Sequence, residues 1–413
     1  MPEIVCDIIS IGDELLIGQV INTNASWIAQ ELNKSGIGVN RILTISDDGK
    51  DITNAIQSVQ SEIVLITGGL GPTKDDITKK VLCEYFNSEL VFHKPTFDHI
   101  VNLFGKRNYP VSDVNKAQAD IPDNCIPLFN EHGTAPGLWF EKDGKVIVSM
   151  PGVPFEMKSL VTNQVIPRII KKFNTGTILH KTIMTIGIGE SRLAELIEDW
   201  ANNLPDHIKL AYLPQPGIVR LRLSSKSDDP EQIQNEFDLQ IKKLKKLIPD
   251  IIYGYDEITM EESIAQLLVK GGKTLATAES CTGGYISHLI TSIPGSSEYF
   301  FGSVVSYANE VKIKHLGVEA SLIEKHGVVS KEVVEQMAIG GKIALGTDYC
   351  IATSGIAGPD GGTKDKPVGT VWIAVATPNG VISKLLNLGE HRGRNIRRSA
   401  LLAMNLLRKE LIK

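Results

Sequence analysis

Cysteine is scarce in this 413-residue chain, and its five cysteines form no recognisable pairing or metal-binding pattern. Their number is odd and no two follow the C-x-x-C spacing, which argues against a disulfide scaffold or structural zinc site and favours a reducing compartment. No apolar run reaches the ~20 residues that span a bilayer. The opening MPEIVCDIISIGDELLIG has no basic stretch and carries acidic residues within its apolar segment, so it predicts a strand rather than a signal peptide. A cytoplasmic location without a membrane partner is expected.

An excess of basic residues is also missing. The net charge of -5 provides no positive field, so neither nucleic acid nor an anionic membrane is expected as a partner. The main basic run, Lys242, Lys243, Lys245 and Lys246, is interpreted as the solvated face of a helix. With 42% hydrophobic and 22% charged residues the composition is that of a globular protein, and the length predicts two or three domains.

The first 170 residues are predicted to form an α/β domain with a parallel sheet. Short β-rich runs (IVCDIISI, VNRILTIS, EIVLIT and KVIVSMPG) alternate with amphipathic segments that predict helices at 24–36, 49–61, from about 77, and at 154–172. Strands that alternate with helices in this way form parallel βαβ units. The segment GDELLIGQV after the first strand is predicted as a loop.

Two further domains are predicted from changes in this pattern. Residues 171–257 combine a strand, a helix, two strands about a Pro-Gly turn and a charged helix, which together make a small α+β module. Residues 258–413 return to alternating strands and helices and contain a hairpin signal at Pro-Asn-Gly. The expected fold class is therefore α/β, with a small α+β module between two larger domains.

Acidic pairs follow three predicted strands of the first domain. Ligands of open α/β sheets bind at the carboxyl ends of strands, so these pairs are expected to converge on one cleft. The third pair ends a glycine-rich run, ITGGLGPTKDDIT, in which glycines allow close approach to a phosphate and a helix N-terminus favours an anion. Carboxylates beside a phosphate cradle suit a divalent cation that bridges to substrate oxygens. The pairs are Asp13 and Glu14, Asp47 and Asp48, and Asp75 and Asp76; Asp48 and Asp75 are equally well explained as helix caps.

Ser280 stands in the run KTLATAESCTGGYISHLI, which predicts a strand, a sharp turn and a helix. A serine at the end of a buried strand, with the following amides open toward it, can act as a nucleophile beside its own oxyanion pocket. Two alternatives stay open. Ser280 can be a helix cap, or Cys281 can be the nucleophile, because a helix N-terminus lowers the pKa of a thiol. We place Cys281 second, as a small residue packed under the turn.

A serine nucleophile needs a base, and no Ser-His-Asp pattern presents itself. His288 and His315 fall within predicted amphipathic helices, and neither His326 nor His391 stands in a glycine-rich or acid-flanked loop, so the histidines are poor candidates. The alternative is a lysine of lowered pKa, as in Ser-Lys hydrolases. The segment SYANEVKIKHLG offers Tyr307 at the end of a strand and Lys312 one turn into the next helix.

The loop SGIAGPDGG follows another predicted strand and is rich in backbone groups suited to a ribose or a phosphate. A plain tight turn would not need nine such residues, which favours a binding role. A 5′-phosphate also calls for an arginine. The candidates are Ser354, Gly355, Gly358 and Gly361 in the loop, and Arg392, Arg394 and Arg397 at the start of the last predicted helix.

Taken together, these runs resemble the competence/damage-inducible CinA family. IGDELLIGQVINTN, TGGLGPTKDD and MPGVPFEM resemble its molybdopterin-binding-like N-terminal domain, and TAESCTGG, SGIAGPDGG and KPVGTVW resemble its C-terminal domain. The resemblance covers the whole chain and fits domains at 1–170, 171–257 and 258–413. The middle one would be the family's KH-like module, which lacks a basic G-x-x-G loop here, so RNA binding is not expected.

For the first domain the resemblance implies metal-dependent hydrolysis of ADP-ribose to AMP and ribose phosphate. A divalent metal ion would be held by carboxylates that the resemblance does not assign individually, with Asp13, Glu14, Asp47 and Asp76 as candidates. The residues matched to the phosphate site are Gly68, Gly69, Gly71 and Thr73 together with Asp76, and Gly133 and Glu156 match further family loops.

For the last domain the resemblance implies an amidase of pyridine nucleotide metabolism that converts nicotinamide mononucleotide to nicotinate mononucleotide and ammonia. It would use Ser280 as nucleophile and Lys312 as base, with Tyr307 nearby and no metal or other cofactor. The amides around Thr282 and Gly283, followed by Gly284, would hold the oxyanion. The sequence departs from the family spacing by two residues before the last helix, so the choice between Arg392 and Arg394 stays open.

The family resemblance also implies a homodimer. Two rival functions are kept: a molybdopterin-type binding or transfer enzyme, which the N-terminal domain alone would favour, and a non-enzymatic accessory role in DNA uptake or recombination. The first leaves the TAESCTGG domain unexplained, and the acidic charge balance speaks against the second.

Overall fold

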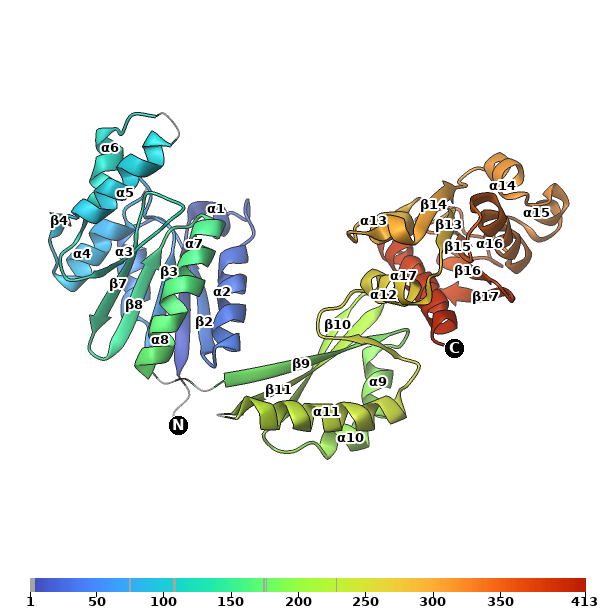
Figure 1. Ribbon diagram of the computed structural model, residues 1–413, viewed down its shortest axis with the longest axis horizontal. Coiled ribbons are helices and arrows are strands. Elements are labelled where there is room, and N and C mark those ends of the chain that lie inside the picture. The colour runs from blue at the N-terminus through green and yellow to red at the C-terminus, as the bar shows by residue number, and fades with distance from the viewer. Residues whose placement is uncertain (1–3, 74–75, 107–108, 174, 176, 228) are drawn as a thin grey trace. The chain divides into compact units, whose positions relative to one another are not determined.

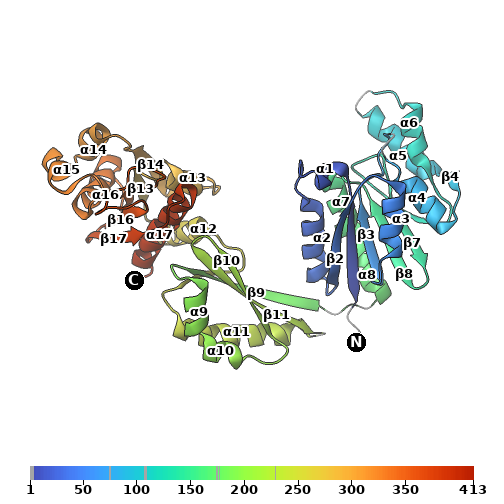
Figure 2. The same ribbon diagram turned by 180° about the vertical axis from the view of Figure 1, so that it is seen from behind.

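The computed structural model describes residues 4–73, 76–106, 109–173, 175, 177–227 and 229–413 (Figures 1 and 2). The chain divides into two compact units, one of residues 1–179 with 226–233 and one of residues 180–225 with 234–413. Within the described ranges no helix is both long and apolar enough to cross a membrane. All five cysteines are free thiols, and four of them are buried: Cys6, Cys83, Cys281 and Cys350.

The first unit is built on a six-stranded sheet in the order β2 (Gly38–Ile45), β1 (Val5–Ile11), β3 (Ile63–Thr67), β8 (Lys145–Met150), β7 (Gly137–Lys142) and β6 (Ile126–Leu128). The first four strands are parallel, as the alternating pattern predicts. The last two pair antiparallel, and β7 joins β8 through a tight turn rather than through a helix. A separate antiparallel pair consists of β4 (Leu90–Phe92) and β5 (Asp120–Pro122).

Helices cover both faces of this sheet because its central strands are apolar on both sides. Ile8 and Leu65 pack into one core, whereas their neighbours Ile9 and Val64 pack into the other. The first core is covered by α2 (Thr23–Lys34), α7 (Pro154–Leu160) and α8 (Ile166–Phe173), and the second by α3 (Gly49–Gln57) and α4 (Thr78–Phe86) (Figure 1). A π-helical turn, η2 (Val161–Val165), joins α7 to α8. The remaining helices are α5 (Lys94–Gly105), α6 (Asp113–Lys116) and the 3-10 turn η1 (Ala117–Ala119).

The prediction of a plain loop after β1 was wrong, because residues Asp13–Leu16 form a one-turn helix, α1. Its first turn carries the two acidic residues Asp13 and Glu14, which a helix N-terminus stabilises. Figure 1 shows α1 at the same end of the sheet as α5 and α6. This end of the sheet carries the first candidate site.

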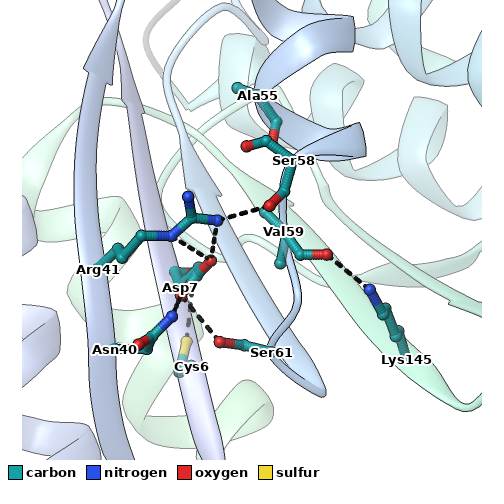
Figure 3. A network of polar contacts seen from close by, with 9 residues as sticks. All are labelled: Cys6, Asp7, Asn40, Arg41, Ala55, Ser58, Val59, Ser61 and Lys145. Carbon is teal, nitrogen blue, oxygen red and sulfur yellow. Dashed lines mark hydrogen bonds and ion pairs between the residues drawn. The ribbon is translucent and has the colours of Figure 1, made fainter.

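The opposite end of β1 is tied to its neighbours through Asp7, whose side chain is fully buried (Figure 3). Burial alone would raise the pKa of this carboxyl, but hydrogen bonds from Arg41, Asn40 and Ser61 outweigh it and lower the pKa. Arg41 also donates to the carbonyl of Ser58, 2.9 Å away. The Asp7 carboxylate therefore holds together β1, β2 and the segment between α3 and β3 at this end of the sheet.

The second unit begins with a four-stranded sheet in the order β10 (Lys209–Gln215), β11 (Ile218–Ser227), β9 (Thr177–Ile186) and β12 (Ile252–Tyr255). Its helices are α9 (Glu190–Leu196), α10 (Glu198–Asn202) and α11 (Pro230–Leu247). Phe237 and Leu244 of α11 are fully buried, whereas the lysines of the basic run are all exposed on the same helix. The predicted α+β module and its solvated helix face are thus confirmed.

A five-stranded sheet follows, in the order β14 (Phe300–Val305), β13 (Leu275–Glu279), β15 (Tyr349–Gly355), β16 (Thr370–Thr377) and β17 (Gly380–Asn387). The first three strands are parallel, and β16 and β17 form the predicted antiparallel hairpin. One face packs against α12 (Met260–Gly271), α13 (Tyr285–Thr291) and α17 (Arg392–Leu411), and the other against α14 (Asn309–Leu316) and α16 (Lys331–Leu345). Short elements complete the unit: η3 (Ser296–Glu298) and α15 (Ala320–His326).

Two candidate active sites

Ser280 follows β13 directly and is nearly buried, with 9% of its surface exposed. Its amide donates to the carbonyl of Thr353 on β15, 3.0 Å away, so the turn is tied to the neighbouring strand. The N-cap of α13 is Gly284, four residues further along. The helix-cap alternative for Ser280 was therefore wrong, and its side chain makes no hydrogen bond to another described residue.

Glu279 performs the capping role instead. Its buried carboxylate accepts from the amides of Gly284 and Ile286 at 3.0 Å and from the amide of Ser287 at 2.9 Å. The hydroxyl of Ser287 adds a fourth hydrogen bond, at 2.5 Å. A carboxylate at a helix N-terminus gains from the helix dipole and satisfies amides that have no helical partner. Sequence reasoning missed this residue, although an acidic residue beside the turn before a helix was a visible signal.

Lys312 lies in the first turns of α14, and only 1% of its surface is exposed. Its Nζ donates to the carbonyl of Ser306, 2.7 Å away, and to that of Tyr307, 3.3 Å away. Burial lowers the pKa of this amine, while Cys281 and Glu310 oppose the shift. A neutral amine has two N–H groups, so two carbonyl partners leave its lone pair available to accept a proton. No hydrogen bond joins Lys312 to Ser280 in the described chain.

Cys281 is excluded as the nucleophile by its surroundings. It packs in the hydrophobic core below the turn, and burial raises its pKa to about 12. Such a thiol stays protonated near neutral pH and is a poor nucleophile. Lys312 lies close to the turn, because its amine donates to the carbonyl of Ser306 and the amide of Ser306 donates to the carbonyl of Glu279, 2.8 Å away. His288 and His315 are exposed, in line with a surface role.

The amides of the turn divide into those that are used and those that are free. Gly283 donates to the carbonyl of Ser280, 3.0 Å away, and Gly284 donates to Glu279. The turn itself uses the Gly283 amide, and the oxyanion role expected for the amides around Thr282 and Gly283 stays a prediction. The amide of Thr282 has no acceptor among the described residues, and its hydroxyl meets that of Thr353 at 2.8 Å. Thr282 is the better oxyanion candidate.

Arg392 joins two parts of the candidate site. Its guanidinium donates to the hydroxyl of Tyr307, 3.2 Å away, and to the carbonyl of Gly358 in the glycine-rich loop, 2.8 Å away. Arg394 instead lines a separate cavity of about 280 Å³ together with Arg398. The geometry thus favours Arg392 over Arg394 as the arginine that contacts Tyr307 and the glycine-rich loop.

Hydrogen bonds from buried side chains hold the backbone around the glycine-rich loop in place. Asn395, which is buried, donates to the carbonyls of Ala357 and Gly389, at 3.0 and 2.6 Å. The hydroxyl of Ser354 is used as well, because it donates to the carbonyl of Val328, 2.7 Å away. A side chain at Gly358 would meet Val368 and the carbonyl of Glu390. The backbone around Gly355, Gly358 and Gly361, rather than the Ser354 hydroxyl, is what the loop can offer a ligand.

A cavity of about 750 Å³ in the first unit gathers most of the residues predicted for the phosphate and metal site. Glycine backbone forms one part of its lining, and carboxylates form another. Asp48 is absent from it and caps α3 by accepting from the amides of Lys50 and Asp51. Asp75 lies outside the described residues. The predicted residues that line the cavity are Asp13, Glu14, Asp47, Asp76, Glu156, Gly68, Gly69 and Gly71.

Two glycines explain why the chain can pass so close to itself here. Gly68 has φ of +107°, and a side chain there would collide with the carbonyl of Ile11. Gly69 has φ of +65°, and a side chain there would collide with the hydroxyl of Thr78. The amides of Gly69 and Gly71 have no acceptor among the described residues, so they can serve a bound anion.

The carboxylates of the cavity fit a cation only in part. Asp13 and Asp47 hold each other through reciprocal bonds to their amides, at 3.0 and 3.4 Å, and Asp76 accepts from the amide of Thr73 at 2.8 Å. The pKa of Asp47 is raised, by burial and by the negative charges around it. In the described parts of the chain no three acidic, histidine or cysteine side chains form a ready metal cluster. The donor set suits an ion such as Mg²⁺, which is often held by one or two carboxylates and completed by water and substrate phosphate.

Asn130 organises the adjoining loop and was missed by sequence reasoning. Its buried amide group donates to the carbonyl of Ala135 at 2.9 Å and to Glu156 at 2.7 Å, and its oxygen accepts from the amide of Gly133 at 3.1 Å. A side chain at Gly133 would collide with Glu156. Gly133 is therefore a packing requirement that lets Glu156 reach the cavity.

Comparison with family models gives three matches along the chain. Residues 7–171 match a probable molybdopterin binding domain, residues 180–254 match the damage-inducible protein CinA KH domain, and residues 257–411 match the CinA C-terminal domain. These matches agree with the N-terminal, middle and C-terminal character expected from the sequence motifs.

Relatives of full length are similar throughout. A CinA-like protein of Flavobacterium psychrophilum is 50% identical in an alignment of 412 positions that covers 98% of each chain. A putative competence-damage inducible protein of Caldicellulosiruptor saccharolyticus is 40% identical and covers 100% of this chain and 99% of its own. Among solved structures, a competence/damage inducible protein of Agrobacterium tumefaciens is 33% identical, with a TM-score of 0.36, over 38% of this chain and 98% of its own.

Proposed function

The chain belongs to the CinA family, and from this premise we propose that its C-terminal domain deamidates nicotinamide mononucleotide to nicotinate mononucleotide and ammonia. The observation that carries the proposal is the buried amine of Lys312, which donates to the carbonyl of Ser306, while the amide of Ser306 donates to the carbonyl of Glu279 beside Ser280. Burial also lowers the pKa of this amine. A serine becomes a nucleophile when a neighbouring base can accept its proton, and a desolvated lysine is such a base.

The proposed reaction has two stages, acylation of Ser280 and hydrolysis of the acyl-enzyme. Lys312 takes the proton of the Ser280 hydroxyl while the Ser280 oxygen attacks the carboxamide carbon. The amide of Thr282 donates to the oxyanion that forms, which is the charge a preorganised donor stabilises best. The protonated Lys312 then gives its proton to the nitrogen, ammonia leaves, and an acyl-enzyme remains. Water, deprotonated by Lys312, hydrolyses the ester and restores Ser280.

Ammonia release from nicotinamide mononucleotide tests the proposal. We expect wild type to release ammonia and both Ser280→Ala and Lys312→Met to lose the activity by about 100-fold or more, since a general base contributes roughly 10²–10⁴-fold. Methionine keeps the apolar stem of the lysine and removes the amine. Lys314→Met, an exposed lysine on the same helix, is the matched control and should behave as wild type. An inactive wild type, or a Ser280→Ala variant as fast as wild type, would refute the mechanism.

We also propose that the first unit hydrolyses ADP-ribose to AMP and ribose phosphate with a divalent metal ion. The cavity that brings free glycine amides and carboxylates together supports this proposal. Asp47, together with Asp13 or Asp76, would hold the ion, which would supply positive charge to the pyrophosphate. The amides of Gly69 and Gly71 would hold the phosphate oxygens, and Glu156 lines the same cavity.

This second activity has a direct test. Cleavage of ADP-ribose should need a divalent cation, stop in excess chelator and be lost in Asp76→Ala. Asp98→Ala, on the exposed side of α5, is the control and should leave the activity unchanged. Cleavage that persists in chelator would contradict the role given to the carboxylates.

A further inference from the structure

A cavity of about 280 Å³ lies in the second unit, where the four-stranded sheet meets the last helix. The turn between β10 and β11 supplies Pro216 and Gly217 to its lining, and α17 supplies Arg394 and Arg398. The turn and the helix are in contact, because a Cβ atom at Gly217 would lie 3.5 Å from Arg398 and 3.7 Å from Leu401. We call this site the arginine cavity.

The two arginines of the cavity carry unpaired charges. Among the described residues, neither guanidinium has a hydrogen-bond acceptor or an ion-pair partner. Arg394 and Arg398 are four residues apart on one helix, so their side chains are neighbours, and like charges at this spacing repel each other. Glu390 is the single carboxylate in the lining and is exposed. The cavity therefore holds an excess of positive charge.

The position of these arginines on α17 makes their charge more unfavourable. The helix begins at Arg392 and has no acidic residue in its first turn. The N-terminal end of a helix carries a partial positive charge, which favours acidic side chains and disfavours basic ones. Arginines in the first two turns therefore reduce stability unless an anion neutralises them. An anion in the cavity would relieve the repulsion between the side chains and the repulsion from the helix dipole together.

Hydrogen-bond donors reach the cavity from both of its sides. The Nδ1 of His391 accepts from the amide of Arg394, 3.3 Å away, so the neutral ring carries its hydrogen on Nε2, which can donate. The amide of Gly217 has no acceptor among the described residues. One guanidinium can satisfy both oxygens of a carboxylate, whereas a terminal phosphate offers three oxygens. Two guanidinium groups with further donors therefore suit a phosphate better than a carboxylate.

The arginine cavity is separate from the candidate amidase site. Arg392 and Arg394 are two residues apart, which places their side chains roughly 200° from each other around the helix. Arg392 contacts Tyr307 and Gly358, whereas Arg394 lines the cavity beside the β10–β11 turn. The same helix end thus presents one arginine to each site.

Hydrogen bonds connect the arginine cavity to the glycine-rich loop. Asn395 lines the cavity and donates to the carbonyl of Gly389, which lines it as well, 2.6 Å away. Asn395 also donates to the carbonyl of Ala357 in the glycine-rich loop, 3.0 Å away. An anion that stabilises the first turns of α17 would therefore also stabilise the attachment of this loop.

We propose that the arginine cavity binds a small phosphate-bearing anion, and that the bound anion stabilises the start of α17. The volume is near the lower end of the range for ligand pockets, which suits a phosphate or pyrophosphate group rather than a whole nucleotide. The proposal assigns a role to the middle module, whose β10–β11 turn closes one side of the site. It depends on neither of the two proposed hydrolytic activities.

Calorimetric binding of inorganic pyrophosphate to the full-length chain, in buffer free of divalent cations, tests the proposal. Arg398→Gln should weaken binding about tenfold or more, as expected for the loss of a charge-assisted hydrogen bond. Arg398→Lys keeps the charge without the planar fork and should recover part of the loss. Arg192→Gln, which replaces an exposed arginine of the same unit, is the matched control and should bind as wild type does.

Hydrogen exchange measured by mass spectrometry locates the bound anion. Pyrophosphate should slow amide exchange in peptides that cover residues 389–400 and 212–219, and Arg398→Gln should abolish this effect. Slower exchange confined to the first unit would place the anion at the glycine amides there and would overturn the proposal. Malonate, a small dicarboxylate, should bind more weakly than pyrophosphate, and equal affinity would contradict a phosphate site.

A substitution on the other side of α17 separates the arginine cavity from the amidase site. Arg392→Gln should keep pyrophosphate binding within about threefold of wild type, because this side chain lies outside the cavity. Binding that is lost in Arg392→Gln and kept in Arg398→Gln would place the anion in the amidase site and refute the proposal. Failure of wild type to release ammonia, with pyrophosphate binding as expected, would refute the amidase alone.

Discussion

Lys312 should set the pH dependence of the proposed amidase. Its pKa is lowered by burial, and only the neutral amine can accept the proton of Ser280. Activity should therefore fall as pH decreases through this lowered pKa and rise to a plateau above it. The measurement is kcat/KM for ammonia release as a function of pH, whose acid limb reports the ionisation of the free enzyme.

Replacing Lys312 with arginine keeps the positive charge but removes the ability to accept a proton. Lys312→Arg stays protonated at every accessible pH, so its activity should be lower by about 10²–10⁴-fold across the whole profile. Lys314→Arg serves as control and should keep the wild-type profile. An acid limb that survives unchanged in Lys312→Arg would assign it to another group.

Glu279 should matter for both stability and activity. Its carboxylate accepts hydrogen bonds from three amides and from the hydroxyls of Ser287 and Thr277, so Glu279→Gln replaces one acceptor oxygen with a donor facing donors. We expect the free energy of unfolding to drop by roughly 1–3 kcal/mol, the cost of leaving a buried polar group unsatisfied. Amidase activity should fall as well, because the turn carries Ser280. Urea unfolding and ammonia release measure the two effects, and Glu298→Gln, which is exposed, should change neither.

At the scale of elements, the turn after β3 depends on two separate properties of glycine. Gly69 and Gly144 both have positive φ, +65° and +78°, but only Gly69 has a close neighbour, the hydroxyl of Thr78. Gly144→Ala should cost about 1–2 kcal/mol through backbone conformation alone. Gly69→Ala should cost more and should reduce ADP-ribose cleavage, whereas Gly144→Ala should not. Thermal unfolding and the cleavage assay distinguish the two variants. Equal losses of stability would show that the contact with Thr78 adds nothing to the cost of Gly69→Ala.

The same elements show what the sequence could and could not predict. The convergence of Asp13, Asp47 and Asp76 on one cavity was predictable because strand ends are local patterns. Ser280 and Lys312 were selected through the family resemblance, and their catalytic roles stay a prediction. Glu279, Asn130 and Asn395 were missed because their roles depend on which amides and carbonyls the folded chain brings within reach. The antiparallel strands β6 and β7 were not predicted, because no helix separates neighbouring strands in this part of the chain. The alternation of strands and helices on which the sequence prediction depended is therefore absent there.

At the scale of the molecule, the two candidate sites lie in different compact units. All residues proposed for ADP-ribose cleavage belong to the first, and all those proposed for the amidase belong to the second. Ser280→Ala should therefore lose ammonia release and keep ADP-ribose cleavage, while Asp47→Asn should do the reverse. Assaying both activities on one preparation of each variant tests this, and loss of both in either folded variant would show that the sites are coupled.

The buried cysteines give this molecule built-in reporters of local opening. Cys6 and Cys350 have no exposed surface, and burial raises the pKa of both thiols. A thiol reagent can reach them only when the surrounding structure opens, so their labelling rates follow the free energy of that opening. Cys6 lies in the first unit and Cys350 in the second. Mass spectrometry of a pulse-labelled sample would then show, for each cysteine-containing peptide, whether a ligand of one unit slows the local opening of that unit alone.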